Sequence, residues 1–130
     1  MRLGNKGLAV DSAAEENGRW VDGPAEWGDV KLLICGTESR AYRAALRERY
    51  SDKVTPEQRE MMIAELVADH LLKGWKGIVD IGGQPVEYAP ATCRSICLNL
   101  DNRRLVEFVL SKAADLHTFD PVAVEQDAKN

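Results

Sequence analysis

The sequence predicts a mainly α-helical domain, or α+β if its small hairpins are counted. The expected unit is compact, with about four to five helices, an N-terminal β-hairpin and a short central ribbon. Apolar residues recur at helical spacing through much of the region 39–114, and clear helix-start signals occur within it. Two short apolar-rich runs near the N-terminus flank a Gly-Pro turn signal. With 130 residues, 45% hydrophobic and 29% charged, the chain has the size and composition of one globular domain.

The two ends of the chain differ in composition from its middle. We expect residues 1–18 to form a flexible N-terminal arm, residues 19–119 to form the globular domain, and residues 120–130 to form a flexible C-terminal tail. The arm mixes glycine, asparagine and acidic residues around one short apolar segment, and the tail is mainly polar.

Two strands are expected at the start of the domain, over residues 19–22 and 30–35. The turn signal Gly23-Pro24 and the pair Trp27-Gly28 separate them, so the strands should pair as a hairpin. The second run is nearly continuously apolar, which fits burial on both faces. Period alone does not distinguish such a run from a buried helix.

The next helix is expected to begin at Thr37 or Ser39 and to end at Tyr50. Its apolar stripe, expected to face the core, consists of Tyr42, Ala45, Leu46 and Tyr50. A second face consists of Arg40, Arg43 and Arg47. These arginines are the concentrated basic feature of a chain with net charge -4. Either a solvated face or a docking surface for an acidic partner would explain them.

The clearest helix start lies at Thr55-Pro56, where a hydroxyl cap and a proline at the first position precede Gln58, which can close a capping box. The apolar face of this helix consists of Met62, Ile63, Leu66, Val67 and Leu71. We expect the helix to end near Leu72, with Gly74 in a left-handed conformation just past it and Trp75 anchoring the following turn on the core.

A short ribbon is expected next, pairing residues 78–81 with residues 86–88 through a turn at Gly82-Gly83. Pro90 then begins a helix. Its inward side is expected to consist of Cys93, Ile96, Cys97 and Leu100. Asp101 is expected to cap the final helix, whose nearly all-round apolar segment 105–110 should be deeply buried or should cover a partner surface.

Composition argues against several classes of protein. A net charge of -4 and a pI near 5.2 disfavour a nucleic-acid partner. No run approaches the roughly 18 apolar residues of a membrane span, and no signal-peptide pattern is present, so we expect no membrane association and a reducing cytoplasm. We expect Cys35, Cys93 and Cys97 to be free, buried thiols.

No catalytic motif is evident, and we predict that the protein is not an enzyme and has no catalytic, cofactor-binding or metal-binding residues. A zinc site that adds His70 or His117 to the cysteines lacks the usual close ligand pairs. A small thiol- or histidine-dependent enzyme, using one of these histidines, is the third-ranked alternative.

The order of motifs resembles a known family. A Trp20-Val21 strand and an apolar strand precede a Tyr-Arg-Ala-Ala-Leu helix at residues 42–46. A long helix then ends in Leu-Lys-Gly-Trp-Lys-Gly at residues 72–77, and Ile-Val-Asp, a glycine turn and Pro-Val-Glu-Tyr-Ala-Pro follow. Over roughly residues 19–119, this order resembles the tail assembly chaperones of long-tailed, siphovirus-type bacteriophages. Ala89 departs from the family, which more often has serine or threonine before the proline.

The resemblance implies a non-catalytic function during phage tail assembly in the host cytoplasm. Such chaperones bind the tape measure protein, promote polymerisation of the tail tube protein around it, and are generally absent from the mature virion. Many are also extended by ribosomal frameshifting, and Ala128-Lys129-Asn130 is compatible with a slippery codon string. The main alternative is a structural phage protein that stays in the virion, such as a head-to-tail connector or a tail completion subunit. The sequence leaves open whether the protein forms a homo-oligomer.

Six residues are the candidate contacts with a partner protein. They are Arg40, Arg43, Arg47, Trp75, Lys76 and Tyr88. The arginines form the basic helix face, and the other three residues belong to the region around the expected ribbon.

Overall fold

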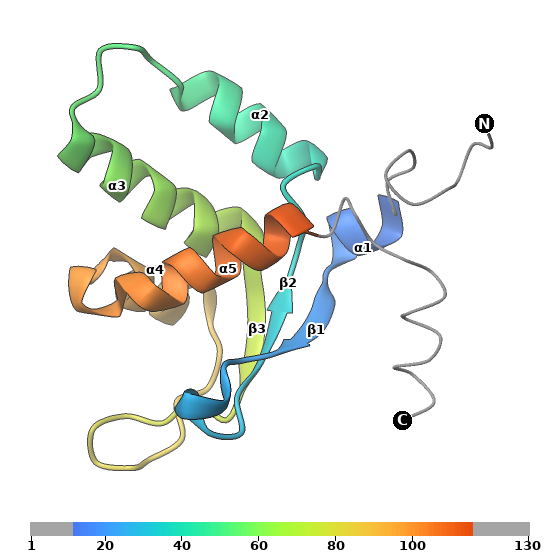
Figure 1. The fold of residues 1–130 in the computed structure, drawn as a ribbon, viewed down its shortest axis with the longest axis vertical. Coiled ribbons are helices and arrows are strands. Elements are labelled where there is room, and N and C mark those ends of the chain that lie inside the picture. Colours follow the sequence, from blue (N-terminus) through green and yellow to red (C-terminus); the bar gives the residue numbers. More distant parts are fainter. Residues whose placement is uncertain (1–11, 116–130) are drawn as a thin grey trace.

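The computed structural model describes residues 12–115 of the chain. These residues form a three-stranded antiparallel sheet with helices packed on one side of it (Figure 1). The elements in chain order are α1 (Ser12–Asn17), β1 (Arg19–Asp22), the 3-10 turn η1 (Ala25–Trp27), β2 (Lys31–Ile34), α2 (Arg40–Arg49), α3 (Pro56–Leu66), the π-helical turn η2 (Val67–Leu71), β3 (Leu72–Lys76), α4 (Pro90–Leu98), the 3-10 turn η3 (Leu100–Asn102) and α5 (Arg103–Asp115). The prediction of a mainly α-helical domain with a small β component is confirmed.

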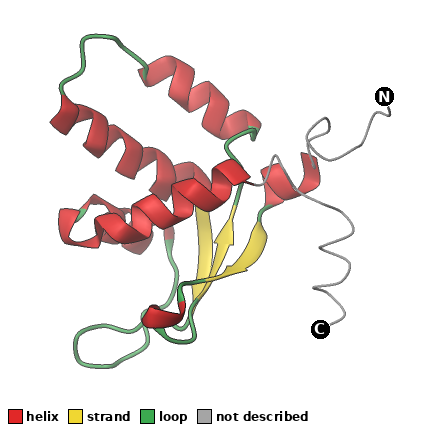
Figure 2. Ribbon diagram, in the orientation of Figure 1, coloured by secondary structure: helices red, strands yellow, loops and turns green. Residues whose placement is uncertain are grey.

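The expected hairpin is present as β1 and β2, which pair antiparallel with Val21 opposite Leu32. The third strand, β3, joins the other side of β2 and places Trp75 opposite Leu32 (Figure 2). Successive side chains of a strand point to opposite faces. Leu32 and Ile34 are therefore buried under the helices, whereas Leu33 lies on the other face and is half-buried.

The core lies between the inner face of the sheet and the helical layer of α3, η2, α4 and α5. Its fully buried side chains include Leu32, Ile34, Val67, Leu71, Leu72, Cys93 and Val109. The long helix starts as expected, because the Thr55 hydroxyl accepts from the backbone N–H of Gln58 and the Gln58 side chain accepts from the backbone N–H of Thr55. None of the described helices is long and apolar enough to span a membrane.

The expected left-handed cap at Gly74 is wrong. The helix that begins at Pro56 continues through η2 and passes directly into β3, and Gly74 lies within that strand without a positive φ. Backbone pairing with β2 takes the place of a C-terminal cap, because it supplies hydrogen-bond partners to this segment. A Cβ at Gly74 would lie 3.3 Å from Leu33 Cβ, so the glycine allows close packing there. The prediction that Trp75 anchors the segment is confirmed, since its side chain is buried.

The expected ribbon is present but shorter than predicted. Residues 78–88 contain a single antiparallel bridge between Val79 and Pro85, beside which the Val86 N–H donates to the Ile78 oxygen and the Asp80 N–H donates to the Gln84 oxygen. The missing N–H of Pro85 does not limit this bridge, because Val79 and Pro85 form a non-hydrogen-bonded pair. The neighbouring groups bond elsewhere: the Val86 oxygen accepts from Trp75 Nε1, and the Gln84 N–H donates to Asp80 Oδ1. The turn itself is present, since Asp80 Oδ1 accepts from the backbone N–H of Gln84 at 2.9 Å. Ile81 is fully exposed at this turn.

Two expectations for the last helices need correction. Helix α5 is amphipathic rather than buried all round: Val106, Val109 and Ala113 are buried, but its other apolar residues are only half-buried. Leu100 is 45% exposed rather than inward, because the chain leaves α4 before it. The cap of η3 is the Asn99 side chain, which accepts from the backbone N–H of Asp101 at 3.0 Å, rather than Asp101 itself.

Residues 12–17 form α1 rather than part of a flexible arm. Glu15 is 1% exposed, and its Oε2 accepts from the backbone N–H of Glu38 at 2.9 Å. Glu16 Oε1 accepts from the backbone N–H of Arg40, the first residue of α2, also at 2.9 Å. Two carboxylates thus join α1 to the start of α2, where helix N–H groups favour negative charge. Residues 1–11 and the expected tail 120–130 lie outside the described residues.

Candidate protein-binding groove

Helix α2 extends away from the sheet and is packed less closely than the other long helices. The Ser39 side chain caps it as expected by accepting from the backbone N–H of Tyr42, but no residue of α2 is buried. Tyr42, Ala45 and Leu46 are half-buried and Tyr50 is 65% exposed. The apolar stripe therefore reaches only the edge of the core, and Figure 1 shows α2 above α3 and α5, joined to α3 by a long loop.

The stripe faces an open groove. Two cavities, of about 420 and 260 Å³, share Val54, Arg59, Ile63 and Leu110, so they form one continuous depression between α2, α3 and α5. Its apolar lining includes Tyr42, Leu46, Tyr50, Val54, Ile63, Val106 and Leu110. We call this depression the α2–α3–α5 groove. An open apolar depression on a small domain is typical of a protein-binding surface.

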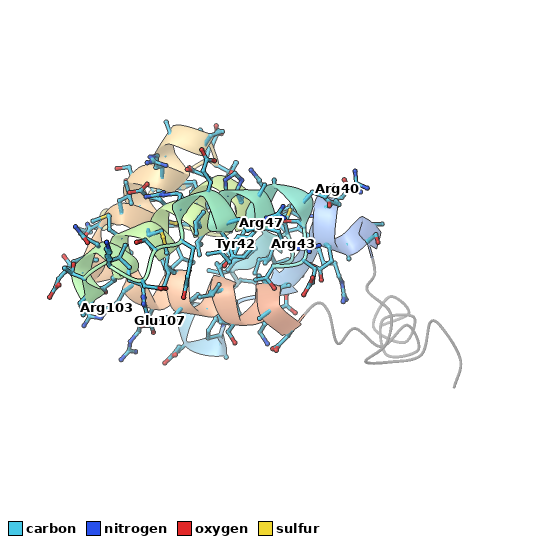
Figure 3. The ribbon with its side chains drawn as sticks, turned by 90° about the horizontal axis from the view of Figure 1, so that it is seen from above. Arg40, Tyr42, Arg43, Arg47, Arg103 and Glu107 are labelled. Atoms are coloured by element: carbon cyan, nitrogen blue, oxygen red, sulfur yellow. The ribbon has the colours of Figure 1, made fainter. Side chains whose placement is uncertain are left out.

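Charged side chains surround the apolar lining of the groove. Those that line it on α3 and α5 are Arg59, Glu60, Arg103 and Glu107. Figure 3 shows Arg40, Arg43 and Arg47 along α2, with Arg103 and Glu107 toward the opposite end of the view from Arg40. The groove therefore has an apolar floor and a charged rim, which is the composition of a typical interface.

The predicted arginine face is exposed to solvent. Among the ion pairs of the described residues, none includes Arg40, Arg43 or Arg47. Arg49 differs, because its guanidinium lies 2.6 Å from a carboxylate oxygen of Glu65 on α3. The basic surface of α2 is thus divided into one side that is paired with α3 and one side that remains available.

None of the six candidate contacts lines either cavity of the groove; Arg40 and Arg43 line a separate cavity with Glu16 and Glu38, and the three candidates outside α2 lie elsewhere. Trp75 Nε1 donates to the backbone oxygen of Val86 at 2.7 Å, and the Tyr88 ring packs edge-on against Trp75 with ring centroids 4.9 Å apart. Lys76 Nζ lies 4.5 Å from the centre of the exposed Trp20 ring. Trp75 and Tyr88 therefore attach the 78–88 loop to the core, and the six candidate residues do not form one site.

The cysteines are free and buried, as the sequence predicts. Cys93 and Cys97 lie one turn apart on α4, and the pKa of the Cys93 thiol is raised by its hydrogen bond with Cys97 and by burial. Burial also raises the pKa of the Cys35 thiol. A raised pKa keeps the Cys35 and Cys93 thiols protonated and disfavours their use as nucleophiles, whereas the hydrogen bond with Cys93 lowers the pKa of Cys97. In the part of the chain that the structure describes, no group of three or more His, Cys, Asp and Glu side chains is arranged to hold a metal ion.

The phenol of Tyr88 makes stability depend on pH in the alkaline range. Its hydroxyl donates to the backbone oxygen of Leu72 at 3.0 Å, and burial, with Cys93 as a further cause, raises the pKa of Tyr88 from 10.0 to about 12. An unfolded tyrosine loses its proton near pH 10, whereas folded Tyr88 keeps it to about pH 12. The folded state therefore binds more protons in this window, so this stabilisation is complete below about pH 10 and is lost as the pH rises toward 12.

We expect Tyr88→Phe to remove this part of the pH dependence. Near neutral pH the variant should lose about 1 kcal/mol, because the hydrogen bond to Leu72 is absent. Its unfolding free energy should then fall less than that of the wild type between about pH 9 and about pH 11. Urea unfolding at both pH values measures this, with Tyr50→Phe, at an exposed position, as the control. Parallel losses in wild type and Tyr88→Phe would contradict the assignment.

One family model matches the chain. It is described as YdaY prophage protein and matches residues 36–130, which is more than half of the chain. The matched region begins just before α2 and includes every residue that lines the groove. Neither the curated proteins nor the solved structures contain a match.

Proposed function

The chain belongs to the YdaY prophage protein family, and we propose that it is a non-catalytic tail assembly chaperone that binds the tape measure protein of its phage. The observation that supports this function best is the α2–α3–α5 groove, an apolar surface bordered by charged residues within the matched region. The order of sequence motifs, which resembles that of tail assembly chaperones, supports the same function. The tail tube protein would then polymerise around the tape measure while the chaperone protects it.

The physical requirement for such a chaperone is reversible cover of apolar helical surface. A long helical tape measure exposes apolar stripes until the tube surrounds it, and exposed stripes lead to aggregation. A groove whose walls are themselves helices can accept one such stripe at a time. The modest size of the groove fits an interaction that must be released when the tube forms, since small interfaces are typical of transient complexes.

Co-expression with the tape measure protein encoded by the same prophage tests this function. We expect the chaperone to keep the tape measure soluble and to co-purify with it. Ile63→Glu should remove most of the co-purification, because it places a charge on the apolar floor of the groove. Met61→Glu introduces the same group on the same helix at an exposed position outside the groove, and it should leave binding unchanged. A tape measure that stays insoluble and unbound with the wild-type chain would overturn the proposal.

A structural subunit of the particle is the second candidate, and the 78–88 loop favours it. Val79 and Ile81 are 55% and 108% exposed, so two apolar side chains lie on the surface of a turn fixed by Asp80. Permanent contact with a neighbouring subunit would cover them. Mass spectrometry of purified virions separates the two candidates. The chaperone should be absent or present in traces, whereas a structural subunit should be present in a fixed number of copies per particle.

A further inference from the structure

We propose that the α2–α3–α5 groove binds a partner α-helix with an apolar stripe and acidic residues along one flank, and that this flank lies against Arg43 and Arg47. This proposal rests on the proposed function, in which the helix belongs to the tape measure protein. It adds the chemistry by which that segment would be recognised and the orientation of its charged flank.

The walls of the groove favour a helix over an extended strand. Strand addition requires a sheet edge with free backbone N–H and C=O groups, and the groove is bordered by α2, α3 and α5, whose backbone groups bond within each helix. Side chains spaced four residues apart lie on one helix face. Tyr42 and Leu46, one turn apart on α2, and Tyr50, the residue after the helix, therefore give the groove an apolar edge for an apolar stripe at positions i, i+3 or i+4, and i+7 of a partner helix.

The helix α2 is suited to be the adjustable wall of this groove. None of its residues is buried, so a shift of α2 to admit a partner breaks few core contacts. Its apolar stripe gains cover when the groove is filled, because Tyr50 is 65% exposed in the free chain.

The ion pairs of the described residues identify which flank of α2 remains open. Arg49 pairs with Glu65, and Glu65 in turn lies 3.3 Å from Arg94 on α4, so charge contacts already close that flank. Arg43 and Arg47 follow Tyr42 and Leu46 in sequence, which places them about 100° further around the helix, on the other flank of the stripe.

The open flank is positively charged. Arg40, Arg43 and Arg47 are exposed, lie three and four residues apart and have no ion pair among the described residues. Like charges at this spacing repel one another. Glu16 and Glu38 line a cavity with Arg40 and Arg43 and offset part of this repulsion, and carboxylates of a bound helix would offset more of it. Charge complementarity therefore favours an acidic flank on the partner, although the whole chain has a net charge of -4 and would attract a basic peptide by long-range electrostatics.

Two labelled model peptides test the inference without the tape measure protein. Both form amphipathic helices of roughly 18 residues, about five turns, with the same leucine stripe, and one has glutamate and the other lysine on its flanks. Fluorescence anisotropy with the full chain measures their binding. At low salt we expect the glutamate peptide to bind at least about tenfold more tightly than the lysine peptide, and we expect the ratio to shrink as salt screens the charges.

Matched variants locate the binding site. Arg43→Glu and Arg47→Glu should each lower the preference for the glutamate peptide several-fold, whereas Arg104→Glu, the same change on α5 outside the groove, should preserve it. Leu46→Glu should weaken both peptides, because it changes the half-buried apolar wall. Circular dichroism confirms that each variant is folded, and α2 has no buried residue whose replacement would disrupt the core.

The outcomes separate this inference from the proposed function. Equal binding of the two peptides, a preference for lysine, or the same loss in Arg104→Glu as in Arg43→Glu would overturn the inference. The inference would also be overturned if the tape measure protein still co-purified with the Arg43→Glu, Arg47→Glu and Leu46→Glu variants. That outcome would leave the proposed function intact. Selective binding of the glutamate peptide that depends on Arg43 and Arg47 supports the inference. If the wild-type chain then fails to bind the tape measure protein, only the proposed function is overturned.

Discussion

Replacing Gly77 with alanine is expected to lower the free energy of unfolding by about 3 kcal/mol. Gly77 directly follows β3 and has a φ of +86°, which L-amino acids with a side chain rarely adopt. A Cβ there would overlap the backbone oxygen of Asp29 and would lie 3.3 Å from Val30 Cα. Because these are backbone atoms, no side-chain rotation relieves the overlap, and the start of β2 must move. Urea denaturation measures the loss as a change in midpoint at constant m-value.

Gly83 is the matched control for this prediction. Its φ of +82° is nearly the same as that of Gly77, but a Cβ at Gly83 would meet no atom within 4 Å. Gly83→Ala should therefore cost only the backbone strain, about 1 kcal/mol. The difference of about 2 kcal/mol between the two variants is the cost of the overlap with Asp29. Equal losses in the two variants would contradict this explanation, because backbone strain alone would then account for Gly77.

Helix starts could be predicted from the sequence because their signals are local. The residues that cap α3 lie within four positions, and Thr55, Pro56 and Gln58 form the capping box in the structure. Pro90 similarly begins α4, and Ala89 leaves that helix without a side-chain cap, as its lack of a hydroxyl implies. Local chemistry of this kind does not depend on the rest of the fold, so a single sequence is enough to recognise it.

Strand β3 could not be predicted in the same way, because its partner is distant in sequence. Residues 72–76 contain a glycine and follow a helix, so local rules indicate a helix end and a turn. The pairing of Leu33 with Gly74 decides the outcome, since it provides backbone hydrogen-bond partners across about forty residues of chain. The π-helical turn η2 also changes the position at which the helix ends. A hydrophobic pattern with the 3.6-residue period of an α-helix does not indicate such a turn.

The candidate site was predictable in part. Three- and four-residue spacing was enough to identify Arg40, Arg43 and Arg47 as one face. The groove beside them depends on how α2, α3 and α5 lie relative to one another, so Val54 and Leu110 could not be assigned to it from sequence. Tyr50 was one signal in the sequence that pointed to the groove. The apolar stripe of α2 continues to this residue, which follows the helix, and the core does not cover it.

Replacing Gly36 with alanine is expected to lower the free energy of unfolding by about 2 kcal/mol, for a reason that a second mutation can remove. Gly36 is buried and has no positive φ, so alanine brings no backbone strain. A Cβ at this position would overlap the buried carboxylate of Glu15. To relieve the overlap, the carboxylate must leave the backbone N–H of Glu38 from which it accepts a hydrogen bond at 2.9 Å. A buried donor then loses its partner, which accounts for much of the cost.

A double-mutant cycle with Glu15→Ala tests this reason directly. Removing the carboxylate frees the volume that the new Cβ requires, so Gly36→Ala should cost less than about 0.5 kcal/mol in the Glu15→Ala background. The coupling energy should therefore be about 1.5 kcal/mol or more, with the double variant more stable than the sum of the single losses predicts. Additive losses would contradict the direct contact. Glu15 and Glu16 accept from the backbone N–H groups of Glu38 and Arg40, so the contact that this cycle tests lies where α1 meets the start of α2, one wall of the groove.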